Sequence, residues 1–172
     1  MGIEVTVIDD SDHVGWAASA TRAGELYMTN VRTMVDRVLR HLAASAPYSR
    51  TCGPGTPTSA SMSRLNILDH GNTTGVEIGT DWITTGTFGT FRGDLARLSG
   101  NFDASGFVHL QHCEAGMNLP LLELFADTVG VPIVAGRGLH NPVYRANFGY
   151  YVRVYPTAGG TRRGSDTFFW RP

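Results

Sequence analysis

Hydrophobic residues recur along the chain in short runs that are typical of β-strands. The runs are rich in Val, Ile and Leu and are bounded by Asp, Gly, Pro or Asn. This pattern predicts strands over residues 3–8, 64–69, 107–112, 133–135 and 150–155.

Between these runs, apolar residues recur at the spacing of amphipathic helices. The longest such stretch covers residues 22–44, and a shorter helix is predicted over 93–99. A third begins at Asn118, a favoured N-cap followed closely by Pro, and ends at Gly130. The Gly- and Thr-rich stretch 72–90 is interpreted as a small hairpin or flap.

The alternation of strands and helices predicts an α/β fold with a mostly parallel sheet and helices on both faces. The chain has 172 residues and is 42% hydrophobic, which is enough for one buried core. No repeat or linker divides it, so residues 1–172 are predicted to form a single domain.

Charge and composition narrow the function classes. The formal net charge is −1, and every basic side chain other than histidine is arginine. A net charge this close to zero gives the protein no overall field that would attract nucleic acid or an anionic membrane. The start of the chain does not resemble a secretory signal, and no apolar run has the length of a membrane span, so we expect a cytoplasmic protein.

Two reactive residue types follow predicted strands. His70 follows the strand at 64–69, and Cys113 follows the strand at 107–112. If these strands are neighbours in a parallel sheet, both side chains lie at the edge where ligands bind. A thiolate is a nucleophile that an imidazole can assist, and the N–H groups of Gly71 and Cys113 could then form an oxyanion hole. The other cysteine, Cys52, lies in a Pro- and Gly-rich loop and is interpreted as an exposed thiol.

These two blocks carry a resemblance to a known group of enzymes. Residues 65–71 read Leu-Asn-Ile-Leu-Asp-His-Gly, and residues 108–116 read Val-His-Leu-Gln-His-Cys-Glu-Ala-Gly. In this order they resemble the caspase-like cysteine peptidases, which include caspases, metacaspases, clostripain-like enzymes and CHAT peptidases. Gln111 echoes the Gln-x-Cys of caspases, whereas Gly116 is closer to the Cys-x-x-Gly of the clostripain and CHAT branches. The same blocks also occur in caspase-like domains of large bacterial surface proteins.

The resemblance implies a caspase-like three-layer sandwich and peptide-bond hydrolysis through a thioester on Cys113. His70 would be the general acid and base, and the substrate would be a protein or peptide. No cofactor and no metal are implied. The long loops at 46–63 and 71–93 are candidate lids or processing sites, so a regulatory protein partner remains open.

The resemblance also implies a pocket for the side chain that precedes the scissile bond. It would be formed by the loop after the first strand, a residue near the cysteine and the loop after the following strand. These positions are Asp9, Asp10, Asp12, Gln111, Arg137 and Gly138. The carboxylates favour an Arg or Lys substrate side chain, and Arg137 favours Asp or Glu. The greater number of acidic residues favours a basic one.

Several alternatives compete with these assignments. One alternative is a peptidase-like binding or assembly module with an idle dyad, and another is a cysteine hydrolase that acts on small amides. Zinc at His109, His112 and Cys113 is disfavoured, because positions 109 and 112 of a strand point to opposite faces. Asp69 could orient His70 or simply end the strand, and we favour the second interpretation.

Overall fold

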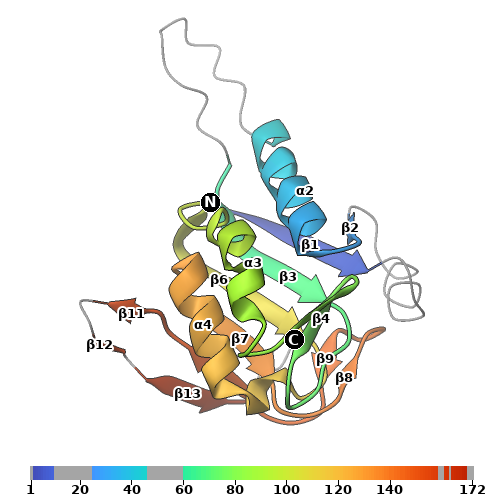
Figure 1. The fold of residues 1–172 in the computed structure, drawn as a ribbon, viewed down its shortest axis with the longest axis vertical. Helices are drawn as coiled ribbons and strands as arrows, with labels where there is room; N and C mark the ends of the chain where they lie inside the picture. Colours follow the sequence, from blue (N-terminus) through green and yellow to red (C-terminus); the bar gives the residue numbers. More distant parts are fainter. Residues whose placement is uncertain (1, 10–24, 46–59, 159–160, 163, 170–172) are drawn as a thin grey trace, which may run out of the picture.

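The computed structural model describes residues 2–9, 25–45, 60–158, 161–162 and 164–169. Its central feature is a seven-stranded sheet in the order β13-β10-β7-β6-β3-β1-β2 (Figure 1). The strands are β1 (Ile3–Asp9), β2 (Leu26–Met28), β3 (Met62–Leu68), β6 (Phe102–Gln111), β7 (Ile133–Gly136), β10 (Tyr151–Val154) and β13 (Ser165–Phe168). All five strands predicted from the sequence are present, with ends shifted by a few residues.

The sheet is mostly parallel. β1, β3, β6 and β7 pair in parallel, as predicted, and β2 adds a further parallel strand beside β1. β10 runs antiparallel to β7, and β13 runs antiparallel to β10. The register places Ile8, Leu68 and Gln111 side by side on β1, β3 and β6. Because side chains alternate along a strand, these three residues share one face of the sheet.

The described helices all lie on the other face. They are α2 (Val31–Ala44), α3 (Phe88–Ala96) and α4 (Leu119–Val129), and they lie side by side across the sheet (Figure 1). Their apolar sides form one core with the alternate residues of the strands, including Val7, Ile67 and Leu110. A second helical layer, which the predicted fold class includes, is not found among the residues that the structure describes.

The face opposite the helices carries buried polar side chains. Asn66 donates hydrogen bonds to Glu4 Oε1 at 2.8 Å and to Thr6 Oγ1 at 3.1 Å. Gln111 Nε2 lies 3.3 Å from Asn66 Oδ1 and 3.2 Å from His109 Nδ1. Asn66, His109 and Gln111 are all buried, so these bonds offset part of the desolvation cost of the polar groups.

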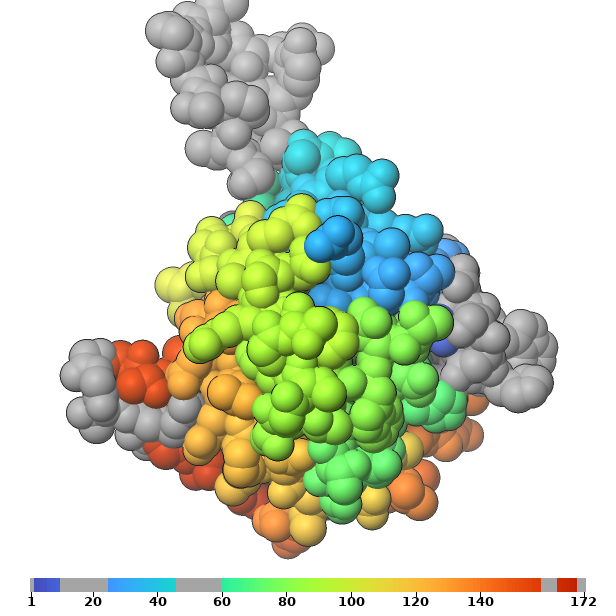
Figure 2. Space-filling view, in the orientation of Figure 1, coloured from blue at the N-terminus to red at the C-terminus, as the bar shows by residue number. Residues whose placement is uncertain are grey.

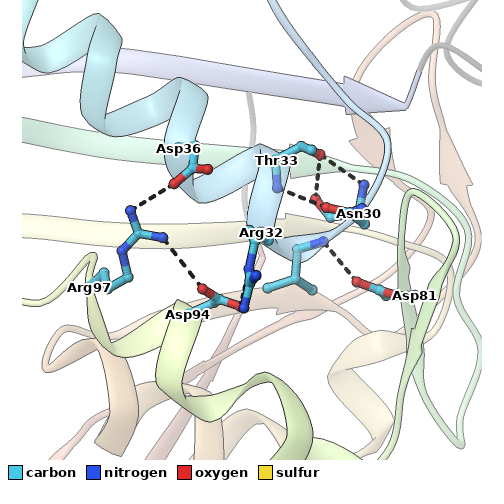
Figure 3. Close-up of polar contacts among 8 residues, drawn as sticks. Asn30, Arg32, Thr33, Asp36, Asp81, Asp94 and Arg97 are labelled. Atoms are coloured by element: carbon cyan, nitrogen blue, oxygen red, sulfur yellow. Dashed lines mark hydrogen bonds and ion pairs between the residues drawn. The ribbon is translucent and has the colours of Figure 1, made fainter.

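The prediction of a helix over 22–44 is wrong at its start. Residues 26–28 form the edge strand β2, and the helix begins after Asn30 (Figure 3). Asn30 Oδ1 accepts the Thr33 N–H at 2.8 Å, and Thr33 Oγ1 accepts the Asn30 N–H at 3.1 Å. This reciprocal capping satisfies the helix start, which is why the helix does not extend back through Tyr27.

Helix α3 spans Phe88–Ala96 and not the predicted 93–99. Ion pairs join it to α2. Arg97 contacts Asp36 at 2.7 Å and Asp94 at 3.4 Å, and Arg32 contacts Asp94 at 3.3 Å (Figure 3). The arginine side chains are exposed, so these pairs contribute little to the free energy of unfolding.

The predicted hairpin is present as β4 (Val76–Ile78) and β5 (Asp81–Ile83). Its turn is tied to the start of α2, because Asp81 Oδ2 accepts the Val31 N–H at 2.9 Å (Figure 3) and the Thr80 N–H donates to Thr29 O at 2.9 Å. The turn of the hairpin is therefore fixed to the start of the helical layer.

Short elements complete the fold. They are η1 (Ala115–Met117) and two small hairpins, β8 (His140–Asn141) with β9 (Ala146–Asn147) and β11 (Thr157–Ala158) with β12 (Thr161–Arg162). Of the helices that the structure describes, none is both long and apolar enough to cross a membrane.

Candidate active site

The two sequence blocks meet at one edge of the sheet. β3 and β6 are neighbouring parallel strands with Leu68 opposite Gln111. His70 and Cys113 each lie two residues beyond this pair, at the carboxyl ends of the strands. On the space-filling view, the green segment around β4 and β5 lies against gold and orange segments at this end of the molecule (Figure 2).

Gly71 lies directly against the cysteine segment. A Cβ atom at Gly71 would lie 2.8 Å from Cβ of His112 and 3.2 Å from the carbonyl oxygen of Cys113. The first of these distances is too short for two carbon atoms that are not bonded. A glycine is therefore required for the two blocks to approach as closely as they do.

The backbone N–H of Gly71 points away from the adjacent hairpin. Gly71 faces Val76 in an isolated antiparallel bridge. The two hydrogen bonds that flank this bridge are from the Asn72 N–H to Gly75 O at 3.0 Å and from the Glu77 N–H to His70 O at 2.9 Å. In such a pair the N–H of the central residue faces outward. It is therefore oriented to donate to a group outside the hairpin, as an oxyanion hole requires.

We expect Gly71→Ala to lower the free energy of unfolding by about 1–3 kcal/mol, because the added methyl group collides with the His112 and Cys113 segment. Gly93→Ala is the matched control. Nothing lies within 4 Å of a Cβ at Gly93, which is inside α3, so this variant should be as stable as the wild type or more so. Urea denaturation of both variants measures the difference, and equal stabilities would contradict the close approach.

The Cys113 thiol is half-buried and contacts the backbone of the β8 strand. The His140 N–H donates a hydrogen bond to Cys113 Sγ at 3.3 Å. The next residue, Glu114, adopts a left-handed conformation with φ 54° and donates its N–H to Gly138 O at 2.8 Å. This turn carries the chain into η1 and leaves the sulfur beside the peptide groups of His140, whose carbonyl oxygen lies 4.0 Å from Sγ as an acceptor for the thiol proton.

Asp69 holds the backbone on the histidine side. Its carboxylate accepts the His70 N–H at 2.7 Å and the Gly79 N–H at 2.8 Å. Burial raises the pKa of Asp69 to about 7, against the lowering effect of these two hydrogen bonds. Both bonds are to backbone groups, which supports the interpretation that Asp69 ends the strand and does not orient the imidazole.

The buried His109 and His112 and the partly buried His140 lie on the cysteine strand and near its exit. Desolvation lowers the pKa of His112 to about 3 and that of His140 to about 4, and it lowers the pKa of His109 well below its usual value. All three are therefore neutral imidazoles at pH 7.

We expect the free energy of unfolding to fall as the pH decreases from 6.5 to about 4. In this range the unfolded chain protonates His109, His112 and His140, whereas the native state keeps them neutral. Asp69 has the opposite effect, because its raised pKa lets the native state bind one proton more than the unfolded state above pH 4. A net uptake of two protons on unfolding corresponds to a slope of up to about 3 kcal/mol per pH unit.

Urea denaturation at pH 7, 6 and 5 measures this slope. Asp69→Asn should make it steeper, because the variant loses the carboxyl group of Asp69, whose protonation opposes it. A stability that is constant or rises on acidification would contradict the neutral state of these histidines.

The residues predicted to line a specificity pocket are not all brought together. Asp10 and Asp12 lie outside the described residues. Asp9 is buried at the end of β1, on the helical face, and Gln111 is buried on the opposite face. The strand register explains this placement, because Gln111 aligns with Ile8 and not with Asp9. The assignment of Asp9 and Gln111 to one specificity pocket stays a prediction.

Arg137 and Gly138 lie close to the cysteine turn but differ in role. Arg137 is exposed, and its Nε lies 3.3 Å from Met117 Sδ. Gly138 is engaged through its backbone, since its N–H donates to Asn147 Oδ1 at 2.9 Å and its carbonyl accepts from Glu114 and Asn147. Gly138 thus supports the cysteine turn, and a larger side chain there would collide with Phe148.

An ion pair near this end of the molecule was not predicted from the sequence. Arg145, in the turn between β8 and β9, contacts Glu25, which directly precedes β2. The side chains are only 9% and 5% exposed. Residues 120 positions apart in the sequence offer no local signal for such a pair. The backbone of Arg145 also has a positive φ of 52°.

Comparisons with family models, curated proteins and solved structures gave no match. The interpretation of the site therefore depends on its own geometry. Within the described parts of the chain, no three or more His, Cys, Asp or Glu side chains are grouped so that they could hold a metal ion.

Proposed function

We propose that this chain is a caspase-like cysteine endopeptidase that uses His70 and Cys113. The observation that carries the proposal is the meeting of the two blocks at one sheet edge, with Gly71 packed against the cysteine segment. The resemblance of the blocks to caspase-like peptidases supplies the reaction, and the layered caspase-like sandwich is part of the same proposal.

In the proposed reaction, the Cys113 sulfur attacks the carbonyl carbon of the scissile bond, and His70 receives the thiol proton. The oxygen of the tetrahedral intermediate accepts hydrogen bonds from the N–H groups of Gly71 and Cys113. The C–N bond then breaks, His70 protonates the leaving amine, and an acyl thioester remains on Cys113. His70 then deprotonates a water molecule, which hydrolyses this thioester. The Cys113 thiolate leaves and takes the proton back from His70.

A positional peptide library, incubated with the wild type and with Cys113→Ala, tests this function. We expect cleavage by the wild type only. Cuts after Arg or Lys would assign the pocket to the acidic segment that begins at Asp9, and cuts after Asp or Glu would assign it to Arg137. Cleavage that persists in Cys113→Ala, or an intact library with the wild type, would count against the proposal.

A second candidate is a binding module with an idle dyad. It is favoured by the large apolar side chains exposed between β7 and β10, which are Leu139, Val143, Tyr144, Phe148 and Tyr150. The alkylation rates of Cys113 and Cys52 with iodoacetamide, followed by peptide mass spectrometry, separate the candidates. An active dyad makes Cys113 react much faster than Cys52 and makes that excess depend on His70, whereas equal rates favour the binding module.

A further inference from the structure

We propose that His112 is a positioning residue that holds the His70 and Gly71 segment beside Cys113. This inference rests on the proposed function, because it concerns the geometry that the reaction needs. The supporting contacts run from the cysteine strand, through the imidazole of His112, to the hairpin that follows Gly71.

The imidazole of His112 binds the hairpin directly. Its Nε2 lies 2.8 Å from the carbonyl oxygen of Glu77, in β4. A carbonyl oxygen only accepts, so Nε2 carries the proton and the bond runs from the ring to the backbone. The side chain is fully buried, and its neutral state agrees with a pKa lowered to about 3 by desolvation.

The same peptide segment then reaches the histidine of the dyad. The Glu77 N–H donates to His70 O at 2.9 Å, and Gly79, two residues further on, donates its N–H to Asp69 at 2.8 Å. His112 is also the residue whose Cβ lies against Gly71. One side chain thus fixes both the carbonyl of Glu77 and the approach of Gly71.

His112 does not act as the general base in this arrangement. It has no exposed surface, and its proton is donated to Glu77 O. Its effect on the reaction is therefore indirect, through the distance and orientation of His70 and of the Gly71 N–H relative to the sulfur. Small displacements of such groups are costly, since a shift of about 1 Å can lower a rate by about 10²-fold.

Two substitutions of His112 separate the hydrogen bond from the volume. His112→Gln retains an N–H donor close to the position of Nε2, whereas His112→Met fills the space without a donor. His109→Met is the matched control for general destabilisation, because His109 is a buried histidine on the same strand but faces away from the hairpin. For each variant, kcat, KM and the pH profile are measured on a library-derived peptide, and hydrogen exchange is measured at the Glu77 and Gly79 amides.

We expect His112→Met to lower kcat by about 10²-fold with little change in KM and with unchanged pH midpoints, since His112 does not titrate in the reaction. Its Glu77 and Gly79 amides should exchange faster. His112→Gln should retain most of kcat and of the protection, and His109→Met should leave both hairpin amides protected.

Unchanged kcat and protection in His112→Met would overturn the proposal. Parallel losses in His112→Met and His109→Met would also overturn it, because they would show a general loss of stability. If the wild type cleaves no peptide, the proposed function fails on its own, and the exchange measurement still decides whether His112 holds the hairpin.

Discussion

His70→Ala is expected to lower kcat/KM for peptide cleavage by about 10²–10⁴-fold, the usual contribution of a general acid and base. The register of β3 and β6 brings the positions of His70 and Cys113 to the same edge of the sheet, and the proposed reaction assigns the proton transfers to this imidazole. The His70 side chain is exposed, so its removal should leave the free energy of unfolding almost unchanged. Steady-state kinetics on a library-derived peptide measure the loss.

His41→Ala is the control for this variant, because His41 lies in the last turn of α2, beside the segment that enters β3 and away from the carboxyl ends of β3 and β6. It should retain wild-type kcat/KM. Equal activity of His70→Ala and His41→Ala would show that the general acid and base is another group.

Arg145→Met is expected to lower the free energy of unfolding by about 3–5 kcal/mol, because it leaves the buried carboxylate of Glu25 without its cation. The variant should also lower activity, since the β8–β9 hairpin contains His140, whose N–H binds the Cys113 sulfur. Urea denaturation at pH 7 measures the first effect.

Two further variants test the cause of this loss. Glu25→Leu combined with Arg145→Met removes both charges and should recover most of the stability. Arg97→Met breaks exposed ion pairs with Asp36 and Asp94 and should lower the free energy of unfolding far less than Arg145→Met does. Equal effects of Arg97→Met and Arg145→Met would contradict the special role of the buried pair.

Local sequence patterns are sufficient to predict the central parallel strands of the sheet. Runs of β-branched and apolar residues identify β1, β3 and β6, and the Asn118 cap with Gly130 identifies α4. These signals are local because a buried strand needs a continuous apolar face and a helix needs a satisfied end.

Features that depend on distant parts of the chain could not be predicted from local sequence patterns. The edge strand β2 was interpreted as part of a helix because Tyr27 fits the helical spacing, although Asn30 and Thr33 together offer a readable capping signal. The β8–β9 hairpin and β13 were not predicted as strands, because they contain few alternating apolar residues.

Some features of the candidate site can be predicted from local patterns, and others cannot. His70, Gly71 and Cys113 were found because each follows an apolar run, and the parallel sheet brings strand ends together. The faces occupied by Asp9 and Gln111 depend on the register between β1, β3 and β6, which no single strand reveals. The contacts of His112 and His140 depend on how the two hairpins fold back over the strand ends.

The thioester on Cys113 is the most direct test of the central claim. The wild type is mixed with a library-derived peptide, quenched in acid within one turnover and analysed by mass spectrometry. The account predicts that the amino-terminal part of the peptide is attached to Cys113, is released by hydroxylamine and is absent from Cys113→Ala. Cleavage without this adduct that continues in Cys113→Ala, or an adduct on another residue, would contradict the assignment of Cys113 as the nucleophile.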